Sequence, residues 1–167
     1  MRHLFLTILI TVSASITFAQ NFSKLSSIPL NDAEDCKNAE PKVLECANYL
    51  LSTPCVESKN SLLAYEFMFK WMVNTPDYKF TIPAKLYLSV SKSGKELSRR
   101  YIACMVKAAM TNNSEYSDAE FMVKYLTIFA EYCENPKYKV PKSAFIKKLI
   151  KAKKNNTLEE FIKEESE

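Results

Sequence analysis

Histidine and glycine are almost absent from this sequence, and their absence excludes several kinds of site. The only histidine is His3 and the only glycine is Gly94. Loops that hold phosphate groups need several glycines, so the Walker and dinucleotide-binding motifs are excluded. Without another histidine, the chain can form neither a Ser-His-Asp or Cys-His catalytic system nor a zinc site with histidine ligands. We therefore name no catalytic residue, no metal site and no cofactor, while chemistry by carboxylates or lysines and binding of calcium remain open alternatives.

The cysteines include no C-x-x-C pair, which argues against a thioredoxin-like redox function. There are five of them, an odd number, so at least one thiol stays free or pairs between molecules. Cys36 and Cys55 flank the first predicted helix in segments expected to be loops, and they form the most plausible disulfide in an oxidising compartment. Cys46 and Cys104 lie on apolar helix faces and are predicted to be buried as small hydrophobic residues.

Residues 1–19 have the pattern of a signal peptide. A basic start at Met1–His3 precedes an apolar segment at residues 4–18, and small residues occupy the positions before Gln20 that a signal peptidase reads. The alternative is an uncleaved membrane anchor, but the apolar run is shorter than the ~20 residues that span a bilayer. We predict an exported protein, periplasmic or secreted after cleavage near Ala19.

Proline, asparagine and serine divide the rest of the chain into apolar segments at helical spacing. Residues 20–40 are polar and contain Pro29, and we expect them to be an extended lead-in to one helical domain at residues 41–167. The predicted helices span residues 41–51, 57–73, 83–93, 96–110, 117–133, 141–154 and 157–167. The predicted fold class is therefore all-α, with a single domain.

The segment Ser61–Phe80 is the most apolar part of the chain after the predicted signal peptide, and it contains the only tryptophan, Trp71. Its apolar residues occupy every face of a helix, and such a helix is normally buried among other helices. We therefore predict that this helix lies at the centre of the domain. Trp71 and Phe69 are predicted core residues, together with Phe129.

A weak internal repeat supports the choice of Phe129. When Ser61–Phe80 is compared with Phe121–Val140, five of twenty positions are identical, including Phe69 with Phe129 and Tyr78 with Tyr138. We interpret the chain as two diverged three-helix units, at about residues 41–93 and 95–154, followed by a short C-terminal helix. The alternative is coincidence in a chain rich in tyrosine, phenylalanine and lysine.

The run Trp71–Phe80, WMVNTPDYKF, resembles a motif in uncharacterised secreted all-α proteins of bacteria. The resemblance covers about ten residues. It implies the same type of domain and brings with it no activity and no catalytic residue.

Two tyrosines are candidate binding residues. Tyr78 and Tyr138 follow equivalent proline-containing turns, and a tyrosine offers a large contact area with a polar tip. In a domain with two similar units they would line equivalent edges of a groove. The alternative is that each ring packs as a lid over the core of its own unit.

The predicted helix at residues 141–154 carries many lysines on one side. One interpretation is contact with an anionic surface, either a membrane or nucleic acid. We favour an amphipathic core helix with a solvated lysine face, because the acidic tail Glu159–Glu167 can screen much of this charge. No nucleic-acid partner is predicted.

Two classes of function remain open. The first is a non-enzymatic module that binds a protein or peptide partner. The second is a hydrolase or lyase that works through carboxylates and lysines, which requires two titratable groups held in one cleft. Glu66 and Glu131 are the candidate carboxylates on the two apolar helices, and they do not align between the two units. The sequence therefore favours the binding module.

The signal-peptide prediction is tested by the mass of the exported protein. Expression of the full chain in a bacterium should yield an envelope or medium fraction whose intact mass corresponds to Gln20–Glu167. A mass that retains residues 1–19 would contradict cleavage and favour the membrane anchor.

Overall fold

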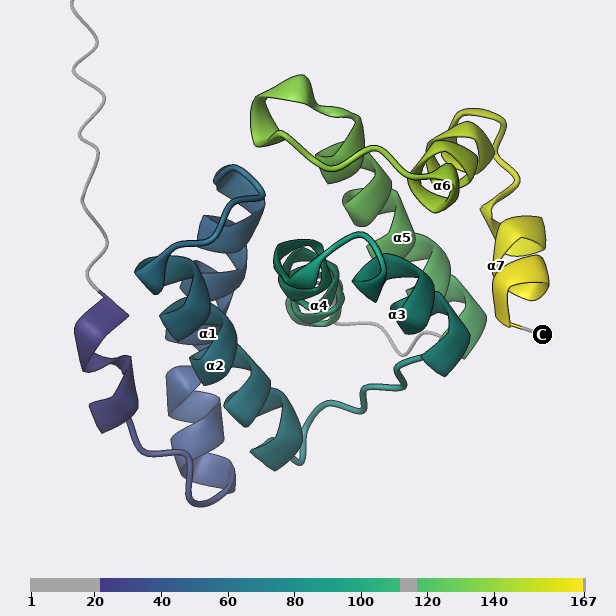
Figure 1. Ribbon diagram of the computed structural model, residues 1–167. Coiled ribbons are helices and arrows are strands. Elements are labelled where there is room, and N and C mark those ends of the chain that lie inside the picture. Colours follow the sequence, from purple (N-terminus) through teal and green to yellow (C-terminus); the bar gives the residue numbers. More distant parts are fainter. Residues whose placement is uncertain (1–21, 112–116, 167) are drawn as a thin grey trace, which may run out of the picture.

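The computed structural model describes residues 22–111 and 117–166, which form helices and loops without a β-strand (Figure 1). This confirms the predicted all-α class. The predicted signal peptide, with its cleavage position near Ala19, lies outside the described residues. Within the two described ranges, none of the helices combines the length and apolar character of a membrane span.

The described residues form seven α-helices and two short 3-10 helices. In chain order they are η1 (Phe22–Ser27), α1 (Ala33–Ser52), α2 (Lys59–Asn74), α3 (Ala84–Ser91), α4 (Lys95–Met110), α5 (Asp118–Glu134), η2 (Pro136–Tyr138), α6 (Ala144–Lys154) and α7 (Leu158–Ser166). Ser117 is the N-cap residue of α5 and forms a capping box with Glu120. Gly94 precedes α4 with φ at +122°, a conformation that suits glycine.

The first α-helix begins at Ala33, so the prediction of an extended lead-in through residue 40 is wrong. The side chain of Asp32 accepts a hydrogen bond from the Asp35 backbone N–H at 2.8 Å, which caps the helix N-terminus. Acidic residues in the first turn also favour this end of the helix dipole. Pro41, which was expected to open the helix, instead lies inside it.

Helix α4 lies at the centre of the bundle, where it packs against α1, α2, α3 and α5 (Figure 1). Ten of its sixteen residues are buried. The prediction that α2 is the central helix is wrong. Helix α2 packs against α1, η1 and α4, and its outer side remains open, so that Phe69 is 38% exposed and Val73 is 69% exposed.

Trp71 and Phe129 are fully buried, whereas the exposed Phe69 is not a core residue. The Trp71 indole N–H donates a hydrogen bond to the Cys36 carbonyl at 2.9 Å, which joins α2 to the first turn of α1. The ring of Phe129 meets the buried Tyr101 ring edge-on at 5.3 Å between centroids. Trp71 therefore joins α2 to α1, whereas Phe129 joins α5 to α4.

The structure does not confirm the two-unit repeat. Phe69 stacks on Tyr65 at the surface of α2, with 5.6 Å between the ring centroids. Their counterparts by the repeat, Phe129 and Tyr125, are both fully buried on α5. The two apolar helices thus occupy different environments, one at the edge of the bundle and one deeper within it.

Truncation of Trp71 should destabilise the protein strongly. Trp71→Ala removes a fully buried ring and its hydrogen bond, and we expect the free energy of unfolding to fall by about 3–5 kcal/mol in urea titrations. Trp71→Phe keeps most of the apolar contact and should cost much less. The matched control is Val73→Ala on the same helix, which should change stability by less than about 0.5 kcal/mol. Equal effects of Trp71→Ala and Val73→Ala would contradict the observed packing.

Candidate functional site

A buried ion pair joins α4 to α2 and to the loop between α1 and α2. Arg100 is 1% exposed, and its guanidinium pairs with the Glu96 carboxylate one helical turn earlier. The same guanidinium donates hydrogen bonds to Ser61 Oγ and to the Pro54 carbonyl, each at 2.8 Å. Ser61 Oγ in turn donates to Glu96 Oε2 at 2.8 Å. The two terminal nitrogens of Arg100, Ser61 Oγ and the Glu96 carboxylate therefore hold one another, whereas the buried Arg100 Nε has no hydrogen-bond partner among the described residues.

The loop after α1 is fixed from three directions. Besides the Arg100 contact, the Tyr132 hydroxyl donates to the Thr53 carbonyl at 2.9 Å. The Cys55 backbone N–H donates to the Tyr138 carbonyl at 2.6 Å. These bonds connect the loop to α4, α5 and η2, so the Arg100 cluster organises the fold around this loop.

Beside this cluster lies a hollow of about 240 Å³, which we call the tyrosine hollow. The residues that line it are Tyr65, Tyr87, Ser91, Lys95, Ser98 and Arg99. The Arg99 guanidinium lies over the Tyr65 ring, with 5.7 Å from its carbon to the ring centroid, and also pairs with Glu96. The hollow is smaller than the roughly 300–1,000 Å³ of a typical small-molecule site. It therefore suits one inserted side chain better than a cofactor.

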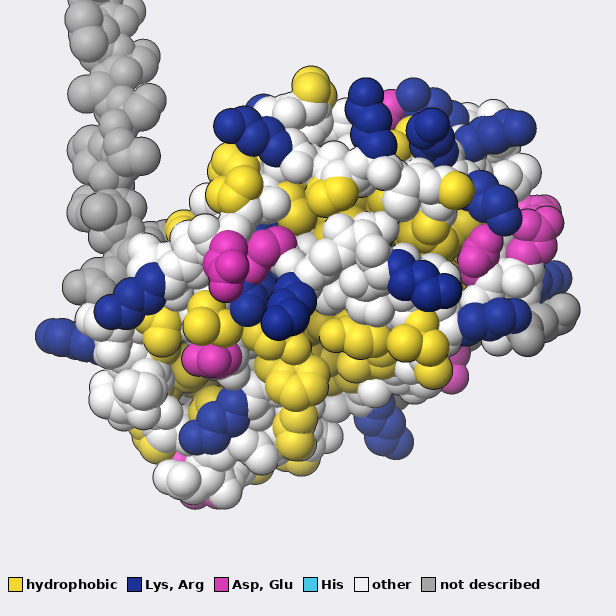
Figure 2. Space-filling view, in the orientation of Figure 1, with side chains coloured by type: hydrophobic (Ala, Val, Ile, Leu, Met, Phe, Trp, Pro, Cys, Tyr) yellow, Lys and Arg dark blue, Asp and Glu magenta, His cyan; other side chains and the backbone are white. Residues whose placement is uncertain are grey.

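An apolar stripe on α2 includes Tyr65, which lines the tyrosine hollow, and Phe69, which stacks on Tyr65. On α2, Leu62, Tyr65, Phe69 and Val73 recur at helical spacing and form one stripe. The large apolar side chains on α2 and α3 that stay exposed are Leu62 (36%), Phe69 (38%), Val73 (69%) and Leu88 (58%). Figure 2 shows the resulting band of yellow side chains across the front of the molecule. We call this band, with Tyr65 and Tyr87, the α2–α3 face.

The segment that carries this face is basic. From Lys59 to Arg99 the sequence has seven lysine and arginine residues and three carboxylates. Two of the three carboxylates are Glu66 on α2 and Glu96, which is engaged with both neighbouring arginines. Lys92 and Lys95 are exposed and form no ion pair with any described residue.

The tyrosines predicted from sequence lie outside this hollow. Tyr78 packs against Trp71 at 5.2 Å between ring centroids, and Tyr138 stacks on Tyr132 at 4.4 Å. Both are half-buried, as expected for rings that cover the core beside their own helix. Neither Tyr78 nor Tyr138 lines the tyrosine hollow. A binding function for these two residues stays a prediction.

The predicted disulfide between Cys36 and Cys55 is wrong. Cys36 lies in the first turn of α1, and Cys55 follows the other end of that 20-residue helix. A helix of this length extends about 30 Å, whereas a disulfide needs Cα atoms within about 7 Å. Both are free thiols, as are Cys46, Cys104 and Cys133. The prediction failed because residues 33–40 were expected to be a loop, whereas they form the first turns of α1.

The structure offers little to the alternative of carboxylate and lysine catalysis. Glu66 is exposed, and the side chain of Glu131 is 59% exposed. The hollow with the largest volume of those described, about 410 Å³, lies between α5 and the start of α7 and includes Lys153, Glu159 and Glu160. Lys153 is already paired with carboxylates of α5. Within residues 22–111 and 117–166, no group of three histidine, cysteine or acidic residues could hold a metal ion.

The lysine-rich helix α6 is partly neutralised by its neighbours. Lys148 pairs with Glu165 of α7 at 3.2 Å, and Lys154 pairs with Glu134 of α5 at 2.5 Å. The Lys154 ammonium lowers the pKa of the Glu134 carboxyl by hydrogen bonding and charge. Lys147 and Lys151 remain exposed without an ion pair among the described residues. Screening by the acidic tail was expected, and the Glu165 pair provides it.

Neither the buried ion pair nor the tyrosine hollow was predicted from the sequence. The spacing of Glu96 to Arg99 and Arg100, three and four residues along one helix, could have indicated ion pairs. No such signal marks Tyr65 or Tyr87, since tyrosines at helical spacing are also typical of a core.

Comparisons with known proteins add no relative. No protein-family model matches this chain, and neither the curated proteins nor the solved structures contain a match.

Loss of both partners of the buried ion pair should cost less than the sum of the two single losses. Arg100→Met leaves Glu96 without its buried partner, and we expect the free energy of unfolding to fall by about 3–5 kcal/mol. Glu96→Gln should lower the free energy of unfolding by a similar amount, because it leaves the buried Arg100 without its carboxylate. The double variant should be more stable than the sum of the single losses predicts, by at least about 1 kcal/mol. Strict additivity in a double-mutant cycle would contradict the coupling, and Lys95→Met on the same helix is the exposed control.

The protein should lose stability at alkaline pH. Burial raises the pKa of the Cys46 thiol from 9.0 to about 12. Above about pH 9 the unfolded chain releases this proton while the folded chain retains it, so the free energy of unfolding falls as pH rises toward 12. Urea titrations at about pH 8 and pH 10 measure the loss. Cys46→Ala should be less stable at both values but lose less between them; an equal loss would exclude Cys46 as a source.

Proposed function

We propose that this protein is a non-enzymatic binding module and that a segment of a protein or peptide partner docks on the α2–α3 face. The observation that carries the proposal is the exposed apolar stripe of α2 beside the tyrosine hollow. Contiguous apolar patches of this kind, rimmed by polar groups, are typical of interaction sites. A hollow that fits one side chain within an apolar face is the usual arrangement for anchoring a peptide.

The face has features of a binding surface beyond its apolar character. Tyr65 and Phe69 are stacked, so they present a preformed aromatic surface at low entropic cost. The Arg99 guanidinium, which pairs with Glu96, also lies over the Tyr65 ring. The central helix α4 therefore supports the face from beneath, and a partner meets a largely rigid surface.

We also propose that the protein acts outside the cytoplasm, after export and removal of residues 1–19. The support is the basic start, apolar segment and small residues that precede Gln20. In such a compartment a module of this kind would meet other exported proteins, in the periplasm or in the medium.

The test is peptide selection on the purified protein. A displayed random peptide library should yield binders to the parent, and each binder should lose roughly tenfold or more in affinity when Phe69→Ser and Leu88→Ser are combined. Leu88 is largely exposed, whereas Phe69 is 38% exposed and stacks on Tyr65, so this variant should remain folded and melt a few degrees below the parent. The matched control is Val56→Ser, a 50% exposed valine in the loop between α1 and α2. Failure to select any peptide, or binding unaffected by the double variant, would overturn the proposal.

A further inference from the structure

The chemistry of the α2–α3 face indicates what kind of partner it binds. We infer that the occupant is an acidic amphipathic peptide segment, which inserts one apolar side chain into the tyrosine hollow and places neighbouring carboxylates against Lys92 and Lys95. This inference rests on the proposed function and adds the chemical class of the partner.

The apolar part of the inference follows from the walls of the hollow. Tyr65 and Tyr87 form its aromatic sides, and Phe69 and Leu88 extend the apolar surface on the adjoining helices. The volume of about 240 Å³ accommodates a leucine or phenylalanine side chain. The stripe on α2 is long enough to contact further apolar residues of the same partner, spaced along a helix or an extended segment.

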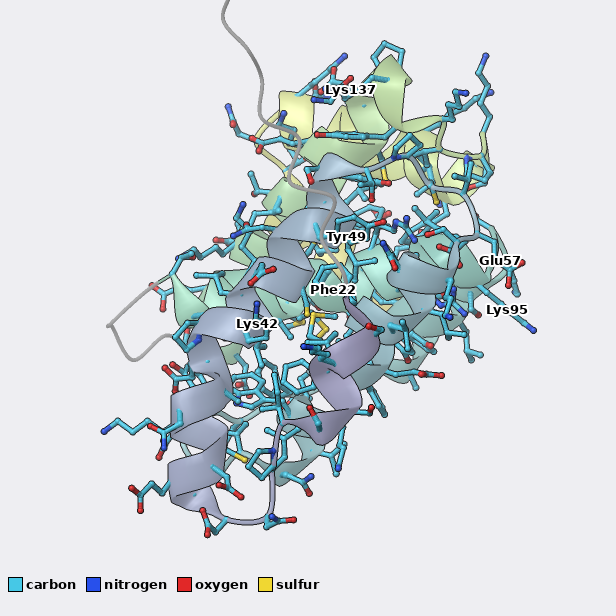
Figure 3. All side chains as sticks on the ribbon, turned by 90° about the vertical axis from the view of Figure 1, so that its left-hand side faces the viewer. Phe22, Lys42, Tyr49, Glu57, Lys95 and Lys137 are labelled. Carbon is cyan, nitrogen blue, oxygen red and sulfur yellow. The ribbon has the colours of Figure 1, made fainter. Side chains whose placement is uncertain are left out.

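The acidic part follows from charge complementarity. Lys95 lines the hollow, and Lys92 lies one residue beyond Ser91, which also lines it. Neither lysine has an ion-pair partner among the described residues, although Glu57 shares a second, adjacent hollow with Lys95. Figure 3 shows Lys95 and Glu57 at the same edge of the molecule, with the Lys95 side chain extending away from the ribbon. Lysine at the rim of an apolar face attracts and orients carboxylates.

The tyrosine hydroxyls provide hydrogen-bond donors that also favour a carboxylate. The hydroxyls of Tyr65 and Tyr87 have no hydrogen-bond partner among the described residues. Burial, and the nearby Tyr87, raise the pKa of Tyr65, so its hydroxyl remains a donor at neutral pH. A carboxylate accepts hydrogen bonds and donates none, so these donors match it. Glu66 is exposed on α2 and would repel a carboxylate placed beside it, so the carboxylates of the partner belong at the Lys92 and Lys95 edge of the face.

A membrane surface fits this face less well than a peptide. The exposed lysines of α6, Lys147 and Lys151, do not line the tyrosine hollow, and α6 packs against α5, α7 and α3. In Figure 2 dark blue side chains gather along the upper edge, apart from the yellow band. A peptide needs only the lysines that rim the hollow, whereas a membrane would be attracted by the lysines of α6 as well.

Two synthetic fluorescein-labelled peptides test the inference. Each is an amphipathic helix of about four turns with leucine and phenylalanine on one side. One carries glutamates beside that side and the other carries lysines at the same positions. In fluorescence anisotropy at low salt, we expect the glutamate peptide to bind the parent and the lysine peptide to bind roughly tenfold more weakly or not at all. Binding of the glutamate peptide should weaken as salt is added.

Charge reversal locates the interaction. In the Lys92→Glu/Lys95→Glu variant, affinity for the glutamate peptide should fall roughly tenfold and the lysine peptide should become the better ligand. The matched control is Lys147→Glu/Lys151→Glu on α6, which changes the net charge equally and should leave binding unchanged. An equal loss in both variants would overturn the inference, because it would show attraction to net charge alone.

Other outcomes also separate this inference from the proposed function. If library-selected peptides bind through Phe69 and Leu88 but both synthetic peptides bind equally, or neither binds, the acidic class is wrong and the binding module stands. If no peptide of any kind binds, the proposed function fails. Sedimentation that shows a dimer disrupted by Phe69→Ser would assign the face to a second copy. Binding to vesicles of anionic lipid that is disrupted by Lys92→Glu/Lys95→Glu would assign it to a membrane; either result overturns the inference.

Discussion

The buried charge of Arg100 is the constraint on which the rest of the structure depends. A guanidinium that is removed from water must find acceptors in the protein, and Arg100 finds them on Glu96, on Ser61 and on the Pro54 carbonyl. These groups come from α4, α2 and the loop that joins α1 to α2. One side chain therefore sets the position of three segments, which apolar contacts alone would allow to slide.

The position of α2 follows from this constraint. Ser61 draws the N-terminal end of α2 toward α4, and the Trp71 indole ties its C-terminal half to the Cys36 carbonyl of α1. Both attachments lie on the same side of α2. The opposite side, with Phe69 and Val73, is left facing outward. An apolar stripe on the surface is thus a consequence of how the helix is fixed, and selection for stability alone would favour polar residues there.

The sequence predicted the helices better than their arrangement. Helical spacing and the punctuation by proline and serine located α2 to α7, because these signals are local. The start of α1 was missed because its first turns depend on the Asp32 cap and on burial of Cys36 and Ala39, which a polar composition conceals. The central position of α4 was missed for a different reason. Helix α4 contains Arg99 and Arg100, and two charged residues are typical of an exposed helix. Only the tertiary contacts show that Arg100 is buried.

The candidate site was beyond the reach of sequence for a related reason. Tyr65 and Phe69 have the same spacing as core residues, and only the folded structure shows that Phe69 is exposed and that Tyr65 lines a hollow. Tyr65 lies on α2, Tyr87 on α3 and Lys95 on α4, so the hollow exists only after three helices have packed. The Glu96 carboxylate connects the buried ion pair to the hollow. It pairs with the buried Arg100 and also with Arg99, which lies over Tyr65. The ion pair that fixes the fold therefore also fixes one wall of the hollow, and a partner that binds there meets a surface held in place by the core.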